Sequence, residues 1–147
     1  MIRIETEKVT IFMILFGVNF NAYFLLLGKH KKDAFKMEEV RWYFGIIFAA
    51  IVIITINIRG YFDNIFIALN HAAFQVGSII TTTGYSTTDF DRWPQLSRNI
   101  IIFLMMCGAC AGSTGGGIKV SRIVVMVKSV FQEIGYYIHP RGVKTIK

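Results

Sequence analysis

Three long runs without a charged side chain limit what this chain can fold into. They cover residues 9–27, 42–58 and 99–118, which are 19, 17 and 20 residues long. At ~1.5 Å per residue, even the shortest would form a helix of about 25 Å, close to the ~30 Å hydrocarbon core of a bilayer. Apolar residues make up 54% of the chain. These runs predict an all-α membrane protein that crosses the bilayer several times.

The net charge of +7 is distributed unevenly. Lysines and arginines cluster in residues 28–41 and from residue 119 onward, whereas residues 59–98 carry only three arginines. By the positive-inside rule, the two basic clusters lie in the cytoplasm and the segment between them reaches the outer side. Membrane lipid is therefore the expected partner, and the charge is no sign of nucleic-acid binding.

A short polar-apolar segment lies between the second and third runs. Asp63 and Asn64 are suitable N-caps for a helix over residues 65–80, which is too short to span and too polar to face lipid. Such a helix is tolerated at membrane depth when it packs inside protein. This order predicts a helix–pore-loop–helix unit preceded by one additional transmembrane helix.

The predicted pore helix runs directly into Thr81, Thr82, Thr83, Gly84 and Tyr85. Threonines favour an extended backbone, and glycine tolerates a left-handed one. An extended strand can aim successive carbonyl oxygens at an axis, where they replace the hydration shell of a cation. We interpret these five residues as an ion-selectivity filter.

The third apolar run is rich in glycine, with five glycines in residues 108–117. A continuous helix there would forgo roughly 5 kcal/mol relative to alanine. We therefore expect a non-helical intramembrane loop that breaks the second helix of the unit, with helix resuming over residues 118–134. A transmembrane dimer face is the alternative interpretation of the glycines. Lys119 beside them is either a functional group on the cavity floor or a lysine that extends to the interface.

Several polar residues allow two interpretations. Asn19 and Asn21 either bond to a neighbouring helix or line a wet cavity. His71 is either a titrating group or a hydrogen-bonding filler of the pore helix. Asp89 and Asp91 either raise the cation concentration at a pore mouth or are solvated loop residues.

The sequence indicates no enzyme, cofactor or metal-binding cluster. Cys107 and Cys110 form a C-x-x-C without further ligands nearby, which predicts small buried thiols. A phosphate-binding loop is excluded because Ile118 separates Gly117 from Lys119 and Val120 replaces the required hydroxyl residue. Scattered serines and histidines form no nucleophile–base pair.

Taken together, several segments resemble the Trk/Ktr/HKT superfamily of potassium transporters, and most closely its TrkH-type membrane subunit. The segments are Thr81-Thr82-Thr83-Gly84-Tyr85, Trp93-Pro94, Gly112-Ser113-Thr114-Gly115-Gly116-Gly117-Ile118-Lys119, Phe16-Gly17-Val18-Asn19-Phe20 and Ile138-His139-Pro140-Arg141. The resemblance implies four helix–pore-loop–helix repeats around one pore. Residues 42–134 would be the third repeat, residues 1–41 the last helix of the second repeat with a cytoplasmic connector, and residues 135–147 a cytoplasmic basic tail. The chain would then be a fragment of the subunit.

The resemblance also implies roles for residues and partners. Thr81 to Tyr85 would form one quarter of the filter, with potassium held at Thr82, Thr83 and Gly84. The gating loop would comprise Gly108, Gly112, Ser113, Thr114, Gly115, Gly116, Gly117 and Lys119. The resemblance further implies a bacterial cytoplasmic (inner) membrane location, a cytoplasmic nucleotide-binding regulatory subunit and a homodimer of the full-length form.

Two alternatives remain at this level. One is a self-contained two-helix cation channel subunit that assembles as a homotetramer, since one filter per chain suits that stoichiometry. The other is a structural membrane protein whose glycine-rich segment serves helix packing.

Overall fold

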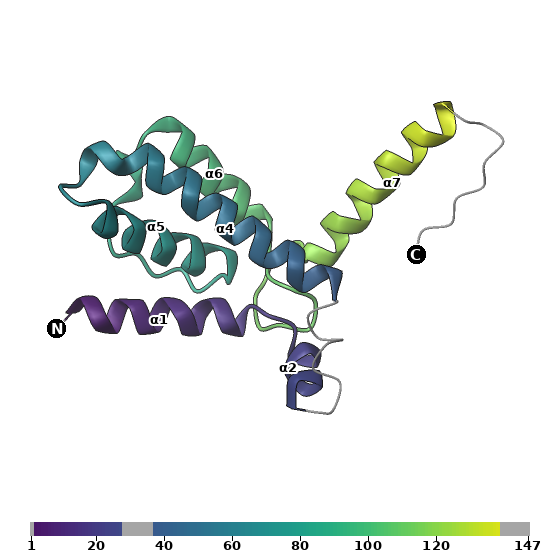
Figure 1. Cartoon of the computed structure of the whole chain (residues 1–147), viewed down its shortest axis with the longest axis horizontal. Helices are drawn as coiled ribbons and strands as arrows, with labels where there is room; N and C mark the ends of the chain where they lie inside the picture. The colour runs from purple at the N-terminus through teal and green to yellow at the C-terminus, as the bar shows by residue number, and fades with distance from the viewer. Residues whose placement is uncertain (1, 28–36, 139–147) are drawn as a thin grey trace.

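The computed structural model describes residues 2–27 and 37–138, with side chains over residues 5–27 and 37–134. In this part of the chain every named secondary-structure element is a helix (Figure 1). They are α1 (Ile2–Phe16), α2 (Phe20–Leu27), α4 (Glu38–Ile58), α5 (Ile65–Ile80), α6 (Gln95–Met106) and α7 (Val120–Ile138), with 3-10 turns at Arg59–Tyr61 and Phe90–Arg92. Most of the predicted connector, and the end of the basic tail from His139-Pro140, lie outside the described residues.

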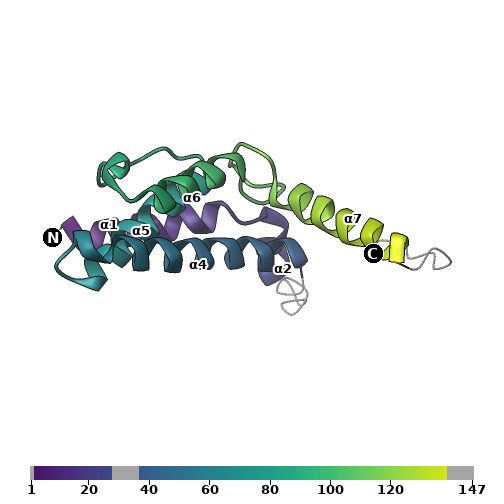
Figure 2. The same ribbon diagram turned by 90° about the horizontal axis from the view of Figure 1, so that it is seen from above.

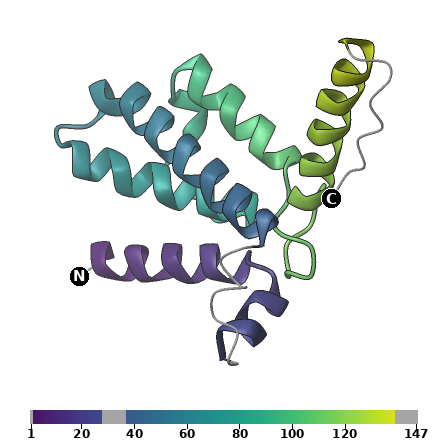
Figure 3. The same ribbon diagram turned by 45° about the vertical axis from the view of Figure 1, so that its right-hand side comes forward.

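Helices α4, α5 and α6 pack together as a bundle, and α1 lies along α5 (Figures 1 and 3). Helix α7 packs against α4 and then leads away from the bundle, as the view from above also shows (Figure 2). The segment between α6 and α7 lies beside the first turn of α4. The bundle thus brings the ends of α5 and α6 close to the break between α1 and α2.

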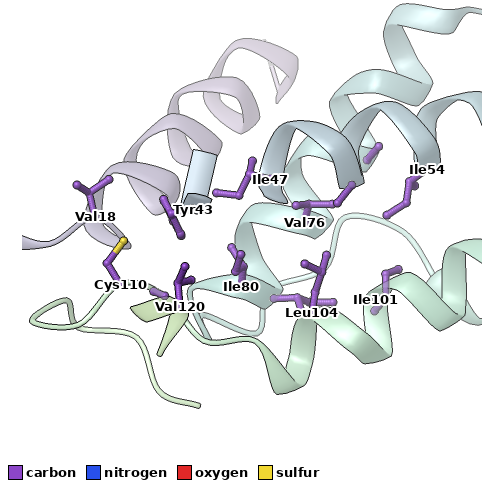
Figure 4. Close-up of a cluster of buried hydrophobic side chains, with 14 of the residues drawn as sticks. Val18, Tyr43, Ile47, Ile54, Val76, Ile80, Ile101, Leu104, Cys110 and Val120 are labelled. Carbon is purple, nitrogen blue, oxygen red and sulfur yellow. The ribbon is translucent and has the colours of Figure 1, made fainter. Parts of the chain in front are cut away.

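One face of α4 forms the centre of the core (Figure 4). Tyr43, Ile47 and Ile54 are almost fully buried and recur at the three- to four-residue spacing of one helix face. They meet buried side chains of α5 and α6, namely Val76, Ile80, Ile101 and Leu104. Because lipid is as apolar as these side chains, close packing rather than water exclusion stabilises the bundle in a membrane.

The first uncharged run does not form the single transmembrane helix that we predicted. Helices α1 and α2 meet at a bend of 94°. At Gly17 the chain lies so close to α4 that a Cβ atom would be 2.1 Å from the hydroxyl oxygen of Tyr43. That hydroxyl donates a hydrogen bond to the carbonyl of Ile14 at 3.0 Å, and Tyr23 donates one to Leu15 at 2.5 Å. These two carbonyl groups also accept the backbone N–H groups of Gly17 and Val18 at 3.2 and 3.0 Å, so the tyrosine hydroxyls add a second bond to each at the break.

Among the described residues, one continuous helical stretch, Glu38–Tyr61, is long and apolar enough to cross a membrane alone. Helices α1 and α2 meet the same criterion only as a bent pair. The apolar helices α5 and α6 have 16 and 12 residues, or about 24 and 18 Å. Backbone that follows them at membrane depth needs hydrogen-bond partners from within the protein.

Candidate functional site

Helix α5 points its C-terminus into the protein. It begins where the sequence predicted, since the side chain of Asn64 accepts a hydrogen bond from the N–H of Phe66. All residues from Phe74 to Ile80 are buried. The five residues that follow, 81–85, are here called the threonine turn.

The threonine turn begins with a tight helix ending. The N–H of Thr82 donates to Ile79 O at 3.0 Å, and the N–H of Thr83 donates to Ser78 O at 2.8 Å. This pair of bonds is a Schellman motif, which needs a left-handed residue at the position of Thr82. Thr82 has a φ of 57°, an unusual value for a β-branched residue. Our expectation of an extended backbone through Thr81 and Thr82 is therefore wrong, because the helix ending bends both residues into a turn.

Side chains and carbonyls in the last helical turn of α5 hold the rest of the threonine turn. The hydroxyl of Ser78, which is fully buried, donates to the carbonyl of Tyr85 at 2.5 Å. The hydroxyl of Thr81 donates to Gly77 O at 2.7 Å and shares a second bond with the hydroxyl of Thr83 at 2.8 Å. Gly84 adopts the left-handed backbone that glycine tolerates, with φ 79°.

The sequence interpretation missed the role of Ser78 and Gln75. The sequence showed only that the helix over residues 65–80 is too polar to face lipid, and Ser78 and Gln75 contribute to that polarity. Their three-residue spacing places both on one helix face, and this signal could have predicted a shared task. Gln75 is buried, and its side-chain oxygen accepts a bond from the hydroxyl of Ser86 at 3.3 Å. Ser78 thus holds the last residue of the threonine turn, and Gln75 holds the residue that follows it.

Residues 108–117, here called the glycine-rich loop, contain no helix and leave α6 and α7 separate. The base of the loop is closed by the N–H of Gly108, which donates to Ile118 O at 2.8 Å, and by the N–H of Val120, which donates to Ala109 O at 3.3 Å. A Cβ atom on Gly108 would lie 2.0 Å from the carbonyl oxygen of Gly116. Close approach of two backbone segments therefore requires glycine there.

Lys119, two residues after the glycine-rich loop, bonds to the backbone of the loop. Its half-buried side chain donates a hydrogen bond to the carbonyl of Gly115. The ammonium group is therefore used to stabilise the loop's own backbone in the described chain, in contrast to a lysine that merely extends to the interface.

The threonine turn and the glycine-rich loop are in direct contact. The N–H of Gly116 donates to the hydroxyl oxygen of Thr82 at 2.9 Å, across 34 positions of sequence. A Cβ atom on Gly115 would lie 3.5 Å from the carbonyl oxygen of Thr81. The structure thus brings together the two segments that sequence analysis had singled out independently.

A second set of contacts holds the other flank of the loop against the break between α1 and α2. The N–H of Cys110 donates to Gly17 O at 3.1 Å, and the N–H of Phe20 donates to Gly112 O at 3.2 Å. The carboxylate of Glu39 accepts from the N–H of Ala111 at 2.5 Å. Glu39 was not among the predicted site residues, because its only signal in the sequence is that of an acidic residue near the start of a helix.

The remaining predicted residues contribute less to this site. Cys107 and Cys110 are buried free thiols, as expected. Asp89 forms an exposed ion pair with Arg92 at 3.5 Å, which suits a loop residue. Within the described ranges, no group of three or more His, Cys, Asp or Glu residues could hold a metal ion.

Ser113 and Thr114 have different surroundings in the loop. Ser113 donates to the carbonyl of Cys110 at 2.6 Å, whereas Thr114 is exposed. His71 is hydrogen-bonded to the hydroxyl of Thr87 at 2.9 Å, which favours the interpretation as a filler.

Comparison with known proteins finds one family model, TrkH, described as a cation transport protein, which matches residues 40–147. The Trk system potassium uptake protein TrkH of Escherichia coli (strain K12) is 35% identical over 144 residues. This match covers 95% of the present chain and 29% of the relative. An uncharacterized cation transporter of Methanocaldococcus jannaschii is 33% identical over 118 residues, covering 80% of the chain and 23% of that relative.

A solved structure has the same fold as this chain. The crystal structure of the potassium transporter TrkH from Vibrio parahaemolyticus superposes with a TM-score of 0.89 at 32% sequence identity. The match covers 97% of the present chain and 31% of the solved one. The chain thus spans about a third of the length of these relatives.

Proposed function

Because the chain belongs to the TrkH family of cation transport proteins, we propose that it forms part of the ion-translocating subunit of a Trk-type potassium uptake system. It is an all-α, multi-pass protein of the bacterial cytoplasmic (inner) membrane, and it transports rather than catalyses. Its residues 42–134 supply one helix–pore-loop–helix repeat. Residues 1–41 supply the end of the preceding repeat and a cytoplasmic connector, and residues 135–147 supply a basic cytoplasmic tail.

The observation that supports this proposal most strongly is the hydrogen bond from Gly116 to Thr82. It joins a turn that suits ion coordination to a loop that suits obstruction of the same pathway. A filter and a gate must lie in series, and two segments in contact satisfy this requirement. A packing role for the glycines alone gives no reason for their contact with the threonine turn.

In this proposal Thr81, Thr82, Thr83, Gly84 and Tyr85 form one quarter of the selectivity filter. The carbonyl oxygens of Thr82, Thr83 and Gly84 replace water around a potassium ion. The bond that Ser78 donates to Tyr85 and the bond that Gly77 accepts from Thr81 favour this use, because a filter must keep its carbonyls in place while ions pass. Residues 82–85 of the threonine turn are exposed in this chain. They are therefore available to face the equivalent segments of other repeats.

The glycine-rich loop, with Lys119 at its edge, is the gate. Its backbone groups bond to three different elements, and each bond can be exchanged without breaking a helix. Glycine-rich backbone has many accessible conformations, which lowers the cost of moving between a closed and an open arrangement. Displacement of the loop from below Thr82 would open a path for the ion toward the cytoplasm.

Two partners complete the proposal. A cytoplasmic nucleotide-binding subunit regulates the gate, and the full-length transporter is a homodimer. Basic residues predicted to lie in the cytoplasm, including Arg122 on α7, provide a surface for such a subunit.

The proposal is tested by uptake of radioactive rubidium in a potassium-uptake-deficient bacterial strain. The strain expresses a full-length Trk-type transporter that carries this chain in the matching segment. Deletion of residues 113–116 should raise rubidium flux severalfold and reduce its dependence on the regulatory subunit. Thr114→Ala, which keeps the loop length, is the matched control. A deletion variant that inserts normally, with flux unchanged or lower, would contradict the gating role.

A further inference from the structure

Two neighbouring glutamates at the start of α4 have different contacts. Both lie in the first helical turn, where the helix dipole favours acidic groups. Glu38 is exposed and pairs with Lys128 of α7. Glu39 is half-buried and turns toward the glycine-rich loop. The dipole explains an acidic residue at either position, but it does not explain why the second carboxylate reaches the loop.

The Glu39 carboxylate joins two segments that are distant in sequence. One oxygen accepts the N–H of Ala111 at 2.5 Å across 72 positions. The other accepts a hydrogen from the side-chain nitrogen of Asn19 at 3.4 Å across 20 positions. Bonds to an ionised acceptor are roughly twice as strong as neutral ones. Glu39 therefore holds the loop to the break between α1 and α2.

The orientation of the Asn19 amide is fixed by its other contact. Its oxygen accepts the N–H of Asn21 at 2.8 Å, at the start of α2. The amide nitrogen, which only donates, is then left to face Glu39. The pair thus has a defined polarity, with Asn19 as donor and Glu39 as acceptor.

We propose that Glu39 is a positioning residue that, together with Asn19, holds the glycine-rich loop in place below the threonine turn. The inference rests on the proposed function, since the loop is the proposed gate. Thr82 holds the loop at Gly116, and Glu39 holds it at Ala111. Loss of Glu39 leaves the Ala111 N–H and the Asn19 amide without their acceptor, and the Ala111 flank of the loop becomes free to move.

An isosteric exchange of donor and acceptor tests this pair. Glu39→Gln retains an oxygen for Ala111 but presents an amide nitrogen to the amide nitrogen of Asn19. Asn19→Asp places two carboxylates together. The double variant restores the pair with inverted polarity, because Gln at 39 donates to Asp at 19 and still accepts from Ala111. Glu38→Gln is the matched control, in the same helical turn and with no contact to the loop.

The first readout is amide hydrogen exchange of peptides from residues 108–117 in the purified full-length transporter. Each single variant should accelerate exchange of this segment roughly tenfold, in line with the loss of one charge-assisted bond. The double variant should return to within about twofold of the parent, a recovery that a general packing defect would not give. The control should leave exchange unchanged. Single variants without acceleration, or a double variant as fast as the singles, would overturn the proposal.

Insertion into the membrane is scored in the same set of variants. A single variant that fails to insert, combined with a double variant that inserts, also supports the pair. The reverse result, with both singles inserted and the double variant lost, counts against it.

Rubidium uptake separates this proposal from the gate itself. Accelerated exchange with raised basal uptake supports both. Accelerated exchange with unchanged uptake keeps Glu39 as a positioning residue and removes the gating role of the loop. Unchanged exchange, in a transporter whose loop deletion does raise uptake, keeps the gate and removes the role of Glu39.

Discussion

The threonine turn and the glycine-rich loop are both non-helical and touch each other, but they are held in different ways. Apart from the bond that Thr82 accepts from Gly116, the turn bonds to residues 77–79 of the helix that precedes it, at most seven positions away. The loop, apart from its closed base, bonds to residues up to 93 positions away, the separation of Cys110 and Gly17. The turn is therefore fixed by its own helix, whereas the place of the loop depends on three other elements.

This difference suits the two proposed roles. Ion selectivity needs carbonyl groups that stay in place, and the bonds from one helix provide this. Gating needs a segment with two arrangements, and a loop held by single bonds to several elements can exchange them. The first three variants below each affect one of the two segments and so separate the two roles, whereas the fourth changes an ion pair outside both.

The largest effect is expected from Gly108→Ala in the glycine-rich loop. The new Cβ would lie 2.0 Å from the backbone oxygen of Gly116, which no side-chain rotation can relieve. Overpacking of this kind costs about 3 kcal/mol or more. Thermal unfolding in detergent should show a large loss of stability, and rubidium uptake should lose its regulation. Gly45→Ala is the control, because a Cβ there would meet no atom within 4 Å. Equal stability of the two variants would show that the loop packs less tightly than described.

Ser78→Ala affects the turn and spares the loop. The buried hydroxyl no longer donates to the carbonyl of Tyr85, a loss of about 1–3 kcal/mol. Competition between sodium and rubidium in the uptake assay should show weaker discrimination. Ser97→Ala is the matched control, since that buried hydroxyl donates to Asn57 on the far side of the bundle from the turn. It should lower stability by a similar amount and leave selectivity unchanged. Selectivity loss in both variants would point to a general effect of destabilisation.

Gly84→Ser is expected to weaken the preference for potassium over sodium up to roughly tenfold. A Cβ on Gly84 would meet no atom within 4 Å in this chain, so the cost comes from the left-handed φ of 79° and amounts to about 1–2 kcal/mol. Relative permeability measured with rubidium and sodium checks this expectation. Gly84→Asn should lose less, because asparagine tolerates this conformation better. An unchanged ion preference in the serine variant would remove Gly84 from the filter.

Lys128→Gln is expected to have the smallest effect. It breaks a largely exposed pair with Glu38 that is worth at most about 1 kcal/mol and is screened by salt. Thermal stability should fall slightly at low ionic strength and match the parent at high ionic strength. A large change in rubidium uptake at unchanged stability would instead assign α7 a direct part in gating.

The same contrast explains which features could be predicted from the sequence. Helix α5 and its Asn64 cap follow from short-range preferences, and the structure has them at the predicted positions. The left-handed backbone of Gly84 is one that the sequence allowed there without requiring it. The left-handed Thr82 was missed because threonine rarely adopts this conformation, and here the helix ending imposes it. The contacts of Glu39 with Asn19 and Ala111 were missed for another reason: they join three segments through tertiary packing, which no local pattern encodes. The break near Gly17 likewise depends on Tyr43 of another helix.

The long reach of the Glu39–Ala111 bond also has a consequence for the order of folding. The threonine turn closes only short stretches of chain and can form together with its helix. The glycine-rich loop must wait until segments 72 to 93 positions apart have met, and closing these longer stretches carries a larger loss of chain entropy. We therefore expect pulse-labelled hydrogen exchange during refolding to protect the turn before the loop. In a newly made transporter, the filter would then exist before the gate that closes it, and the membrane would be exposed to an ungated pathway until the last contacts form.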